Sequence, residues 1–158
     1  HSEYIDKAIS KNLSTIAMEL VPRVTKAQSM DVLSSQSNLA GYRAVIEACY
    51  YYDRAFPMMM TAAGTVNPAK VLIIGVGVAG LQAIATAKRL GAAVSAYDVR
   101  AATKEQVESL NAKFVYPAAG LVDREDKSGY AKEVTKDFAA VQEEFLLGII
   151  ANFDIVIT

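Results

Sequence analysis

The chain has 158 residues and a formal net charge of −1, and 53% of its residues are hydrophobic. This length is enough for one domain with a substantial core, while the near-zero net charge gives no indication of binding to nucleic acid or to an anionic membrane surface. No apolar run approaches the roughly 18 residues that a membrane-spanning helix needs.

The first part of the chain is expected to hold a short helix followed by a polar segment. Residues 4–17 predict a short helix or an approach segment, and Pro22 stops the mostly apolar stretch that comes next. Residues 23–36 are polar, with the chemistry of turns and caps rather than the pattern of a core element. Three serines are suited to cap the helix that follows: Ser34, Ser35 and Ser37.

A longer helix is predicted after this segment. Apolar residues recur at helical spacing from about residue 39 and predict a helix to about Arg54, which Pro57 ends. Cys49 is the single cysteine, so an internal disulfide is excluded, and its place in this pattern favours a buried, inert thiol. The methionines at 58–60 are expected to fill core space, and residues 62–68 to form a linker.

The second half of the chain alternates strand-like and helical segments. The order β-α-β-α-β predicts an α/β fold with parallel strands and right-handed crossovers. The predicted elements are a strand at 70–75, a helix at 79–90, a strand at 93–98, a helix at about 102–110, a short strand at 113–116, a charged loop at 117–129, a helix at about 130–147 and a buried strand at 153–158.

These elements predict an incomplete Rossmann-type parallel sheet of about four strands, preceded by a connecting loop and a long helix. A complete dinucleotide-binding fold has about six strands, so we expect the chain to be a piece of a longer polypeptide. Residues 1–66 would then be the C-terminal part of a first subdomain, with residues 67–158 forming the nucleotide-binding domain.

A glycine motif follows the first strand of this half. Gly75 permits a tight turn, Gly77 allows a pyrophosphate to approach the backbone, and Gly80 lets the next helix pack closely on the strand. The backbone at Val78 and Ala79, where the helix starts, would face the phosphates, because the helix dipole favours negative charge there; simple packing explains Val78 equally well. If the motif is considered without its context, a glycine-rich turn in an ordinary α/β protein is the alternative to a dinucleotide-binding site.

Asp98 turns the motif into a more specific signal. It lies 18 residues past Gly80, at the end of the second strand, where a carboxylate accepts hydrogen bonds from the hydroxyls of the adenosine ribose. Val99 and Arg100 would flank the adenosine. Arg100 is suited to hold the 2′-phosphate of NADP, but the carboxylate of Asp98 would repel that phosphate. We therefore predict NAD(H) as the cofactor and predict no metal site.

Four segments resemble the NAD(H)-binding domain of proton-translocating nicotinamide nucleotide transhydrogenase, which lies on the alpha subunit in bacterial forms. They are residues 28–47, 55–66, 75–87 and 98–107. The resemblance implies that hydride passes directly from NADH on this domain to NADP+ on a partner domain, while a membrane domain couples the transfer to proton movement. It also implies a homodimer, and a soluble domain of a complex in the bacterial cytoplasmic membrane or the mitochondrial inner membrane.

The resemblance assigns roles to the polar loop. Arg23, Gln28 and Asp31 match the loop that holds the nicotinamide end of the cofactor near the second nucleotide, and Ser34 matches a donor to the carboxamide. Direct hydride transfer needs the two nicotinamide rings at near-contact distance, so positioning carries much of the catalysis. From spacing alone, a role as caps and loop residues is the favoured explanation for all four, and it is the resemblance that reverses this preference.

The resemblance also includes a loop that folds over the nucleotide in this family. Gly129 and Tyr130 match it, whereas residues 117–128 depart from the family in sequence, and Tyr130 is equally suited to start a helix.

Two other functions compete with this hypothesis. Alanine dehydrogenase is a structural relative, but oxidative deamination needs a general base, commonly histidine, and His1 is the only histidine here. Hydride exchange between two nicotinamides needs no proton acceptor, which favours the transhydrogenase. A non-catalytic NAD-sensing module is the third interpretation, and it leaves the loop from Arg23 to Ser34 without a purpose.

Overall fold

The computed structural model describes residues 2–22, 24–117 and 136–158. The chain divides into two compact units, His1–Gln36 and Ser37–Thr158. The first unit comprises helix α1 (Ser2–Ser10), the short 3-10 helices η1 (Met18–Leu20) and η2 (Thr25–Met30), and the start of helix α2 (Val32–Tyr51). The polar segment predicted from the sequence is therefore mostly helical.

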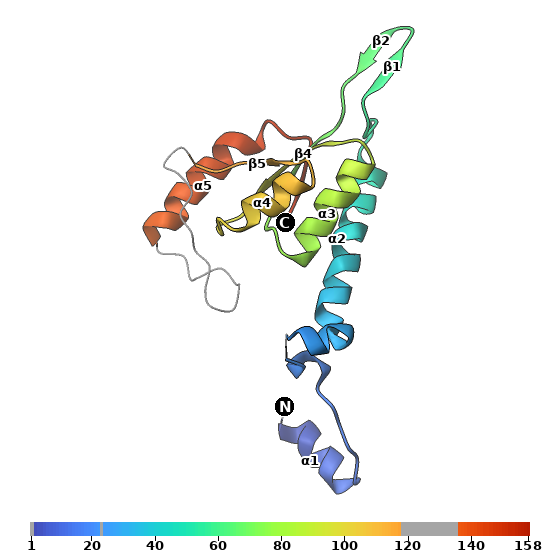
Figure 1. The fold of residues 1–158 in the computed structure, drawn as a ribbon, viewed down its shortest axis with the longest axis vertical. Coiled ribbons are helices and arrows are strands. Elements are labelled where there is room, and N and C mark those ends of the chain that lie inside the picture. Colours follow the sequence, from blue (N-terminus) through green and yellow to red (C-terminus); the bar gives the residue numbers. More distant parts are fainter. Residues whose placement is uncertain (1, 23, 118–135) are drawn as a thin grey trace. The chain divides into compact units, whose positions relative to one another are not determined.

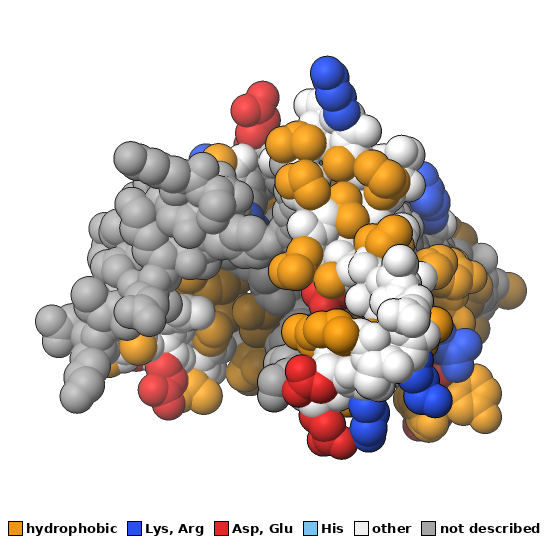
Figure 2. Space-filling model, turned by 90° about the horizontal axis from the view of Figure 1, so that it is seen from below, with side chains coloured by type: hydrophobic (Ala, Val, Ile, Leu, Met, Phe, Trp, Pro, Cys, Tyr) orange, Lys and Arg blue, Asp and Glu red, His pale blue; other side chains and the backbone are white. Residues whose placement is uncertain are grey.

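Many hydrophobic side chains of the first unit are exposed. They include Tyr4, Ile9, Leu13, Ile16 and Leu20. Figure 2 shows hydrophobic side chains gathered on part of one face of the molecule. Ala27 of η2 is buried by contrast. These side chains bury little of their surface, so the described residues of the first unit contribute little to a hydrophobic core.

The second unit is built on a parallel sheet (Figure 1). In the described part of the chain the strand order is β5-β4-β3-β6, and all three adjacent pairs are parallel. The strands are β3 (Lys70–Ile74), β4 (Ala93–Tyr97), β5 (Lys113–Phe114) and β6 (Ile155–Ile157). The prediction of an α/β fold with a Rossmann-type parallel sheet of about four strands is confirmed.

The order of the strands creates a switch point at β3. The chain moves from β3 outward to β4 and β5, and then returns to the opposite side of β3 with β6. Ile74 and Tyr97 are partners in the register, so the carboxyl ends of β3 and β4 lie side by side. In open α/β sheets this is the edge at which ligands bind.

Helices cover the sheet and bury the middle of β3. Helix α3 (Val78–Arg89) connects β3 to β4, α4 (Thr103–Ser109) connects β4 to β5, and α5 (Lys136–Ile150) precedes β6. Figure 1 shows α5 on the opposite side of the sheet from α2 and α3. Val71, Leu72 and Ile73 are fully buried, because a parallel strand covered on both faces needs apolar side chains on both.

Two glycines bring the start of α3 close to its neighbours. A Cβ atom on Gly80 would lie 1.9 Å from the carbonyl oxygen of Gly75, and one on Gly41 of α2 would lie 2.0 Å from the carbonyl oxygen of Ala79. No side chain fits at either contact. The first turn of α3 is therefore held between the end of β3 and the side of α2.

A hairpin replaces the linker and the core methionines that the sequence predicts. Residues 59–66 form the antiparallel pair β1 (Met59–Thr61) and β2 (Gly64–Val66), in which Gly64 has φ +124° and Thr61 Oγ1 donates to the Gly64 carbonyl at 2.8 Å. Met58, Met59 and Met60 are 60%, 42% and 78% exposed, so the prediction that they fill core space is wrong.

Several predicted boundaries also shift. Helix α2 begins at Val32 and ends at Tyr51, earlier than predicted at both ends. Strand β6 is only partly buried, because it lies at the edge of the described sheet. The described part of α5 starts at Lys136, and the predicted start near residue 130 lies outside the described residues. The predicted boundary between residues 66 and 67 stays a prediction.

Within residues 2–22, 24–117 and 136–158, no helix combines the length and apolar character needed to cross a membrane. Among the same residues, no group of three or more His, Cys, Asp or Glu side chains is placed to hold a metal ion.

Candidate nucleotide-binding site

The glycine turn joins β3 to α3 at the switch point. Gly75 has φ +94°, which favours glycine, and its N–H donates to the Tyr97 carbonyl at 2.8 Å across the end of β4. Gly77 is the N-cap of α3, and its carbonyl accepts the N–H of Leu81. The backbone N–H groups of Val78, Ala79 and Gly80 lie in the first turn, ahead of that bond, where an anion is favoured.

The three glycines of the motif have different structural needs. The turn requires the positive φ of Gly75, and close packing requires Gly80. Gly77 has an ordinary φ of −88°, and a Cβ atom there would meet no atom within 4 Å. The protein itself therefore gives no reason for a glycine at position 77, whereas a pyrophosphate lying against this backbone does. Val78 is 42% exposed, so packing does not explain that residue either.

Asp98 lies directly after β4 and is bonded on both oxygens. Its Oδ2 accepts the Val76 N–H at 2.7 Å and Nη2 of Arg100 at 2.9 Å. Its Oδ1 accepts the backbone N–H of Arg100 at 2.8 Å and Nε of Arg100 at 2.9 Å. Arg100 Nη2 also donates to the Val76 carbonyl at 2.9 Å. The carboxylate is thus fixed beside the glycine turn.

The electrostatic environment keeps Asp98 ionised. Burial opposes the charge, but hydrogen bonds from the Arg100 side chain and from the backbone N–H groups of Val76 and Arg100 outweigh it and lower the pKa of Asp98. Burial, assisted by the charge of Asp98, raises the pKa of the neighbouring Tyr97 hydroxyl. At neutral pH the site therefore presents a carboxylate beside a neutral phenol.

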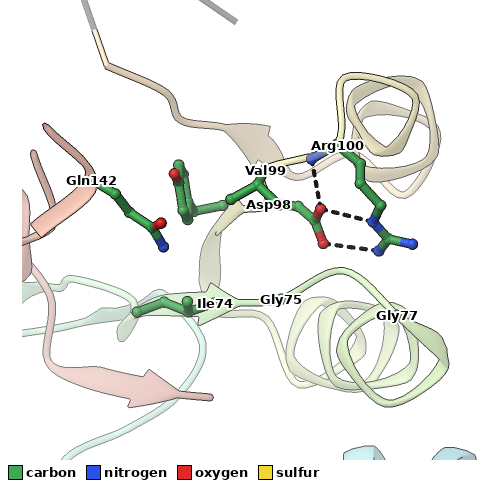
Figure 3. A pocket seen from close by; sticks show the side chains of 8 residues that line it. Ile74, Gly75, Gly77, Asp98, Val99, Arg100 and Gln142 are labelled. Carbon is green, nitrogen blue, oxygen red and sulfur yellow. Dashed lines mark hydrogen bonds and ion pairs between the residues drawn. The ribbon is translucent and has the colours of Figure 1, made fainter. Parts of the chain in front are cut away.

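A cavity of about 360 Å³ opens at this edge of the sheet. It is lined by the ends of β3 and β4, the glycine turn and one side chain from α5: Ile74, Gly75, Gly77, Tyr97, Asp98, Val99, Arg100 and Gln142. Figure 3 shows Asp98 and Arg100 meeting on one side of the cavity and Gln142 entering from the other.

Sequence reasoning missed Gln142. Its place in the cavity follows from tertiary packing, since the Phe145 ring, one turn further along α5, packs on the Tyr97 ring with centroids 5.6 Å apart. A polar residue one turn from an aromatic residue was the available signal, and it is a weak one.

The polar loop of the first unit forms a helix cap. Asp31 precedes α2, its Oδ1 accepts the Ser34 N–H at 3.0 Å, and its Oδ2 accepts the Ser34 hydroxyl at 2.7 Å. The cap of α2 is therefore Asp31, not Ser34, Ser35 or Ser37 as predicted, because α2 starts at Val32, about two turns before the apolar pattern from which the helix was predicted. Gln28 is exposed on η2, and its carbonyl accepts the Asp31 N–H.

The structure brings eight of the predicted residues together in the second unit. They are Gly75, Gly77, Val78, Ala79, Gly80, Asp98, Val99 and Arg100. Gln28, Asp31 and Ser34 lie in the first unit. Arg23, Gly129 and Tyr130 lie outside the described residues.

A parallel sheet with a glycine turn, the first turn of a helix and a fixed carboxylate at its switch point defines a Rossmann-type nucleotide-binding domain. The model of the family "Alanine dehydrogenase/PNT, C-terminal domain" matches residues 44–158. The chain belongs to this family.

Similar proteins include two bacterial proteins that are each named as the first portion of NAD(P) transhydrogenase subunit alpha. The one from Rickettsia prowazekii is 67% identical over 156 residues, which are 99% of this chain and 40% of that protein. The one from Rhodospirillum rubrum is 59% identical over 155 residues, 98% of this chain and 40% of that protein. The chain thus spans about two fifths of the length of these relatives.

Solved structures agree with this placement. A transhydrogenase from Sinorhizobium meliloti is 55% identical, has a TM-score of 0.80, and is matched over 99% of this chain and 40% of its own. An L-alanine dehydrogenase is 26% identical with a TM-score of 0.58, over 74% of this chain and 34% of its own. The predicted resemblance to transhydrogenase and the relation to alanine dehydrogenase are both confirmed.

Proposed function

We propose that this chain is the NAD(H)-binding part of a proton-translocating transhydrogenase, in which hydride passes directly between NADH and NADP+. The observation that carries the proposal is the glycine turn with Asp98 beside it, in a chain 67% identical to a transhydrogenase alpha subunit. A bound NADH supplies the hydride. The residues of this chain bind and orient the cofactor.

In the proposed complex the two phosphates lie over the first turn of α3. The N–H groups of Val78, Ala79 and Gly80 would donate to them, and the open space at Gly77 would let them approach. Asp98 would accept the ribose hydroxyls, while Val99 would flank the adenosine. The carboxylate supports NADH over NADPH, because it would repel a 2′-phosphate.

The first unit would act on the nicotinamide end. Arg23, Gln28, Asp31 and Ser34 would hold the ring so that it meets the ring of the second nucleotide, and positioning of this kind supplies much of the rate. Gly129 and Tyr130 would close over the nucleotide. Residues 1–66 would form the end of a first subdomain, with residues 67–158 forming the NAD-binding domain.

The partners in this proposal are an NADP(H)-binding domain, a membrane domain that couples the transfer to proton movement, and a second copy of the chain. The complex would lie in a bacterial cytoplasmic membrane, with this domain on the cytosolic side, or in the mitochondrial inner membrane. The exposed methionines of the β1–β2 hairpin support the homodimer, because exposed apolar side chains gathered on a short hairpin favour a protein contact.

An alanine-dehydrogenase-like activity is the alternative, favoured by the TM-score of 0.58 to L-alanine dehydrogenase. The experiment that separates the two uses the full subunit containing this chain. NADH and NADPH are titrated by calorimetry, and the subunit is then assayed with its NADP(H)-binding partner for hydride transfer, and alone for oxidation of L-alanine with NAD+. We expect tighter binding of NADH, transfer between nucleotides and no alanine oxidation. Equal affinity for the two cofactors would contradict the role of Asp98.

A further inference from the structure

The proposed function uses Asp98 to read the ribose, but in the structure this carboxylate already holds Arg100. Nε of Arg100 bonds to one oxygen and Nη2 to the other, both at 2.9 Å, in the two-pronged geometry that guanidinium and carboxylate groups favour. The side chains of Arg100 and Asp98 are 18% and 7% exposed. The pair is therefore a partly buried ion pair, not a loose surface contact.

The acceptor sites of the carboxylate are already in use. An ionised carboxylate offers about four lone-pair positions. The backbone N–H groups of Val76 and Arg100 take two of them, and the guanidinium takes two more. A ribose hydroxyl that bonds to Asp98 must replace one of the two guanidinium bonds and leaves the other in place, because the two backbone donors are fixed by the glycine turn and by the end of β4.

The guanidinium stays next to the ribose position whether or not a ribose hydroxyl is bonded to Asp98. It lines the same cavity as Gly77 and Asp98, and Nη2 also bonds to the Val76 carbonyl in the turn. A phosphate on the 2′-oxygen would lie where the carboxylate now lies. Phosphate and carboxylate accept the guanidinium through the same two parallel hydrogen bonds.

On the basis of the proposed NAD(H) site, we infer that Arg100 is a latent 2′-phosphate ligand that Asp98 keeps engaged. Asp98 thus excludes NADPH in two ways. It repels the phosphate, and it occupies the cation that would otherwise bind it. Removing the carboxylate alone converts the site toward NADPH, without any added positive charge.

The test is a double-mutant cycle in the full subunit, with Asp98→Ser, Arg100→Gln and the combined variant. Serine removes the charge and leaves room for a phosphate. The probes are NADH, NADPH and the smaller pair adenosine 5′-monophosphate and adenosine 2′,5′-bisphosphate, each titrated by calorimetry. We expect Asp98→Ser to bind NADPH and the bisphosphate about tenfold more tightly than the parent does, which is the effect of one charge-assisted pair. The combined variant should lose this gain, while Arg100→Gln alone should leave NADPH binding weak.

Two controls keep the result specific. Lys104→Gln in the Asp98→Ser background removes another cation of the same region, one that is exposed and faces Glu108 and the Tyr116 ring, and it should retain the gain. Asp98→Asn keeps the shape of the side chain and replaces Asp98→Ser in the cycle if the serine variant fails to fold. Its gain in NADPH affinity is expected to be smaller. The inference is overturned if the gain is absent, or if it survives Arg100→Gln. A parent that binds neither NADH nor NADPH would instead refute the proposed function.

Discussion

The motif glycines differ in what an added methyl group would meet, and this difference separates folding from cofactor binding. At Gly80 a Cβ atom would lie 1.9 Å from the Gly75 carbonyl oxygen and 3.6 Å from Cγ2 of Ile73. Relieving the first contact requires the start of α3 to move more than an ångström from β3. The N–H of Gly75 is bonded to Tyr97, so the turn cannot simply yield. Overpacking of this kind costs about 3 kcal/mol.

Gly77→Ala should behave in the opposite way. The new Cβ would meet no protein atom within 4 Å, and a φ of −88° suits alanine. We therefore expect its free energy of unfolding to fall by no more than about 1 kcal/mol, which is the usual N-cap preference for glycine over alanine. The methyl group would occupy the approach of the pyrophosphate, and losing about 2 kcal/mol of charge-assisted bonding weakens NADH binding about thirtyfold.

The assay combines urea unfolding of the full subunit with calorimetric titration of NADH. Gly148→Ala is the matched control, because Gly148 lies within α5 with no atom near its Cβ position, and alanine there should stabilise the protein by about 0.5–1 kcal/mol. Gly80→Ala with parental stability would refute the packing argument. Gly77→Ala with parental NADH affinity would refute the placement of the pyrophosphate over α3.

Three further predictions concern other parts of the molecule. The pKa of Asp98 is lowered in the folded state, so the stability that its ionised form contributes is fully present above the unfolded pKa of about 3.9 and is lost as the pH falls through the folded pKa. Asp98→Asn should therefore lower the free energy of unfolding by about 2 kcal/mol at pH 7. Urea midpoints of the parent and the variant should approach each other below pH 4. Gln28→Ala should slow hydride transfer in the reconstituted complex at an unchanged melting temperature, and a transfer rate equal to that of the parent would reject its role. Asp31→Ala should slow transfer and also lower the free energy of unfolding by about 1 kcal/mol, because it removes a helix cap. Met60→Lys, at a side chain that is 78% exposed, should weaken self-association in sedimentation equilibrium without lowering stability, and an unchanged dimer constant would exclude the hairpin as the contact.

The sheet was predictable because its signals are local. The apolar run at 71–74, the glycine motif, the helix and the second strand follow one another directly in the sequence. A strand, a helix and a second strand in this order favour a parallel arrangement. Asp98 was predictable from its distance to the motif. The contacts that fix it were not, because they depend on the Arg100 side chain folding back on its own turn.

The features that were missed depend on long-range packing or on competing local signals. Gln142 reaches the cavity only because Phe145 packs on Tyr97. The methionines at 58–60 have the composition of a core segment, yet Gly64 with positive φ turns the chain into an exposed hairpin. Asp31 lies before a helix that begins at Val32, whereas the regular helical spacing of apolar residues begins near Leu39, so the apolar pattern places the cap too late in the chain.

The capping role of Asp31 changes how its proposed part in hydride transfer must be tested. Its two oxygens accept the backbone N–H and the hydroxyl of Ser34, so substituting either residue disturbs the first turn of α2 as well as any contact with the nicotinamide. Asp31→Asn is the informative variant, because asparagine caps helices about as well as aspartate. We expect it to keep the stability of the parent while removing a negative charge beside the proposed nicotinamide position. If transfer then slows at constant NADH affinity, the carboxylate acts on the ring; a rate equal to that of the parent would assign Asp31 to the cap alone.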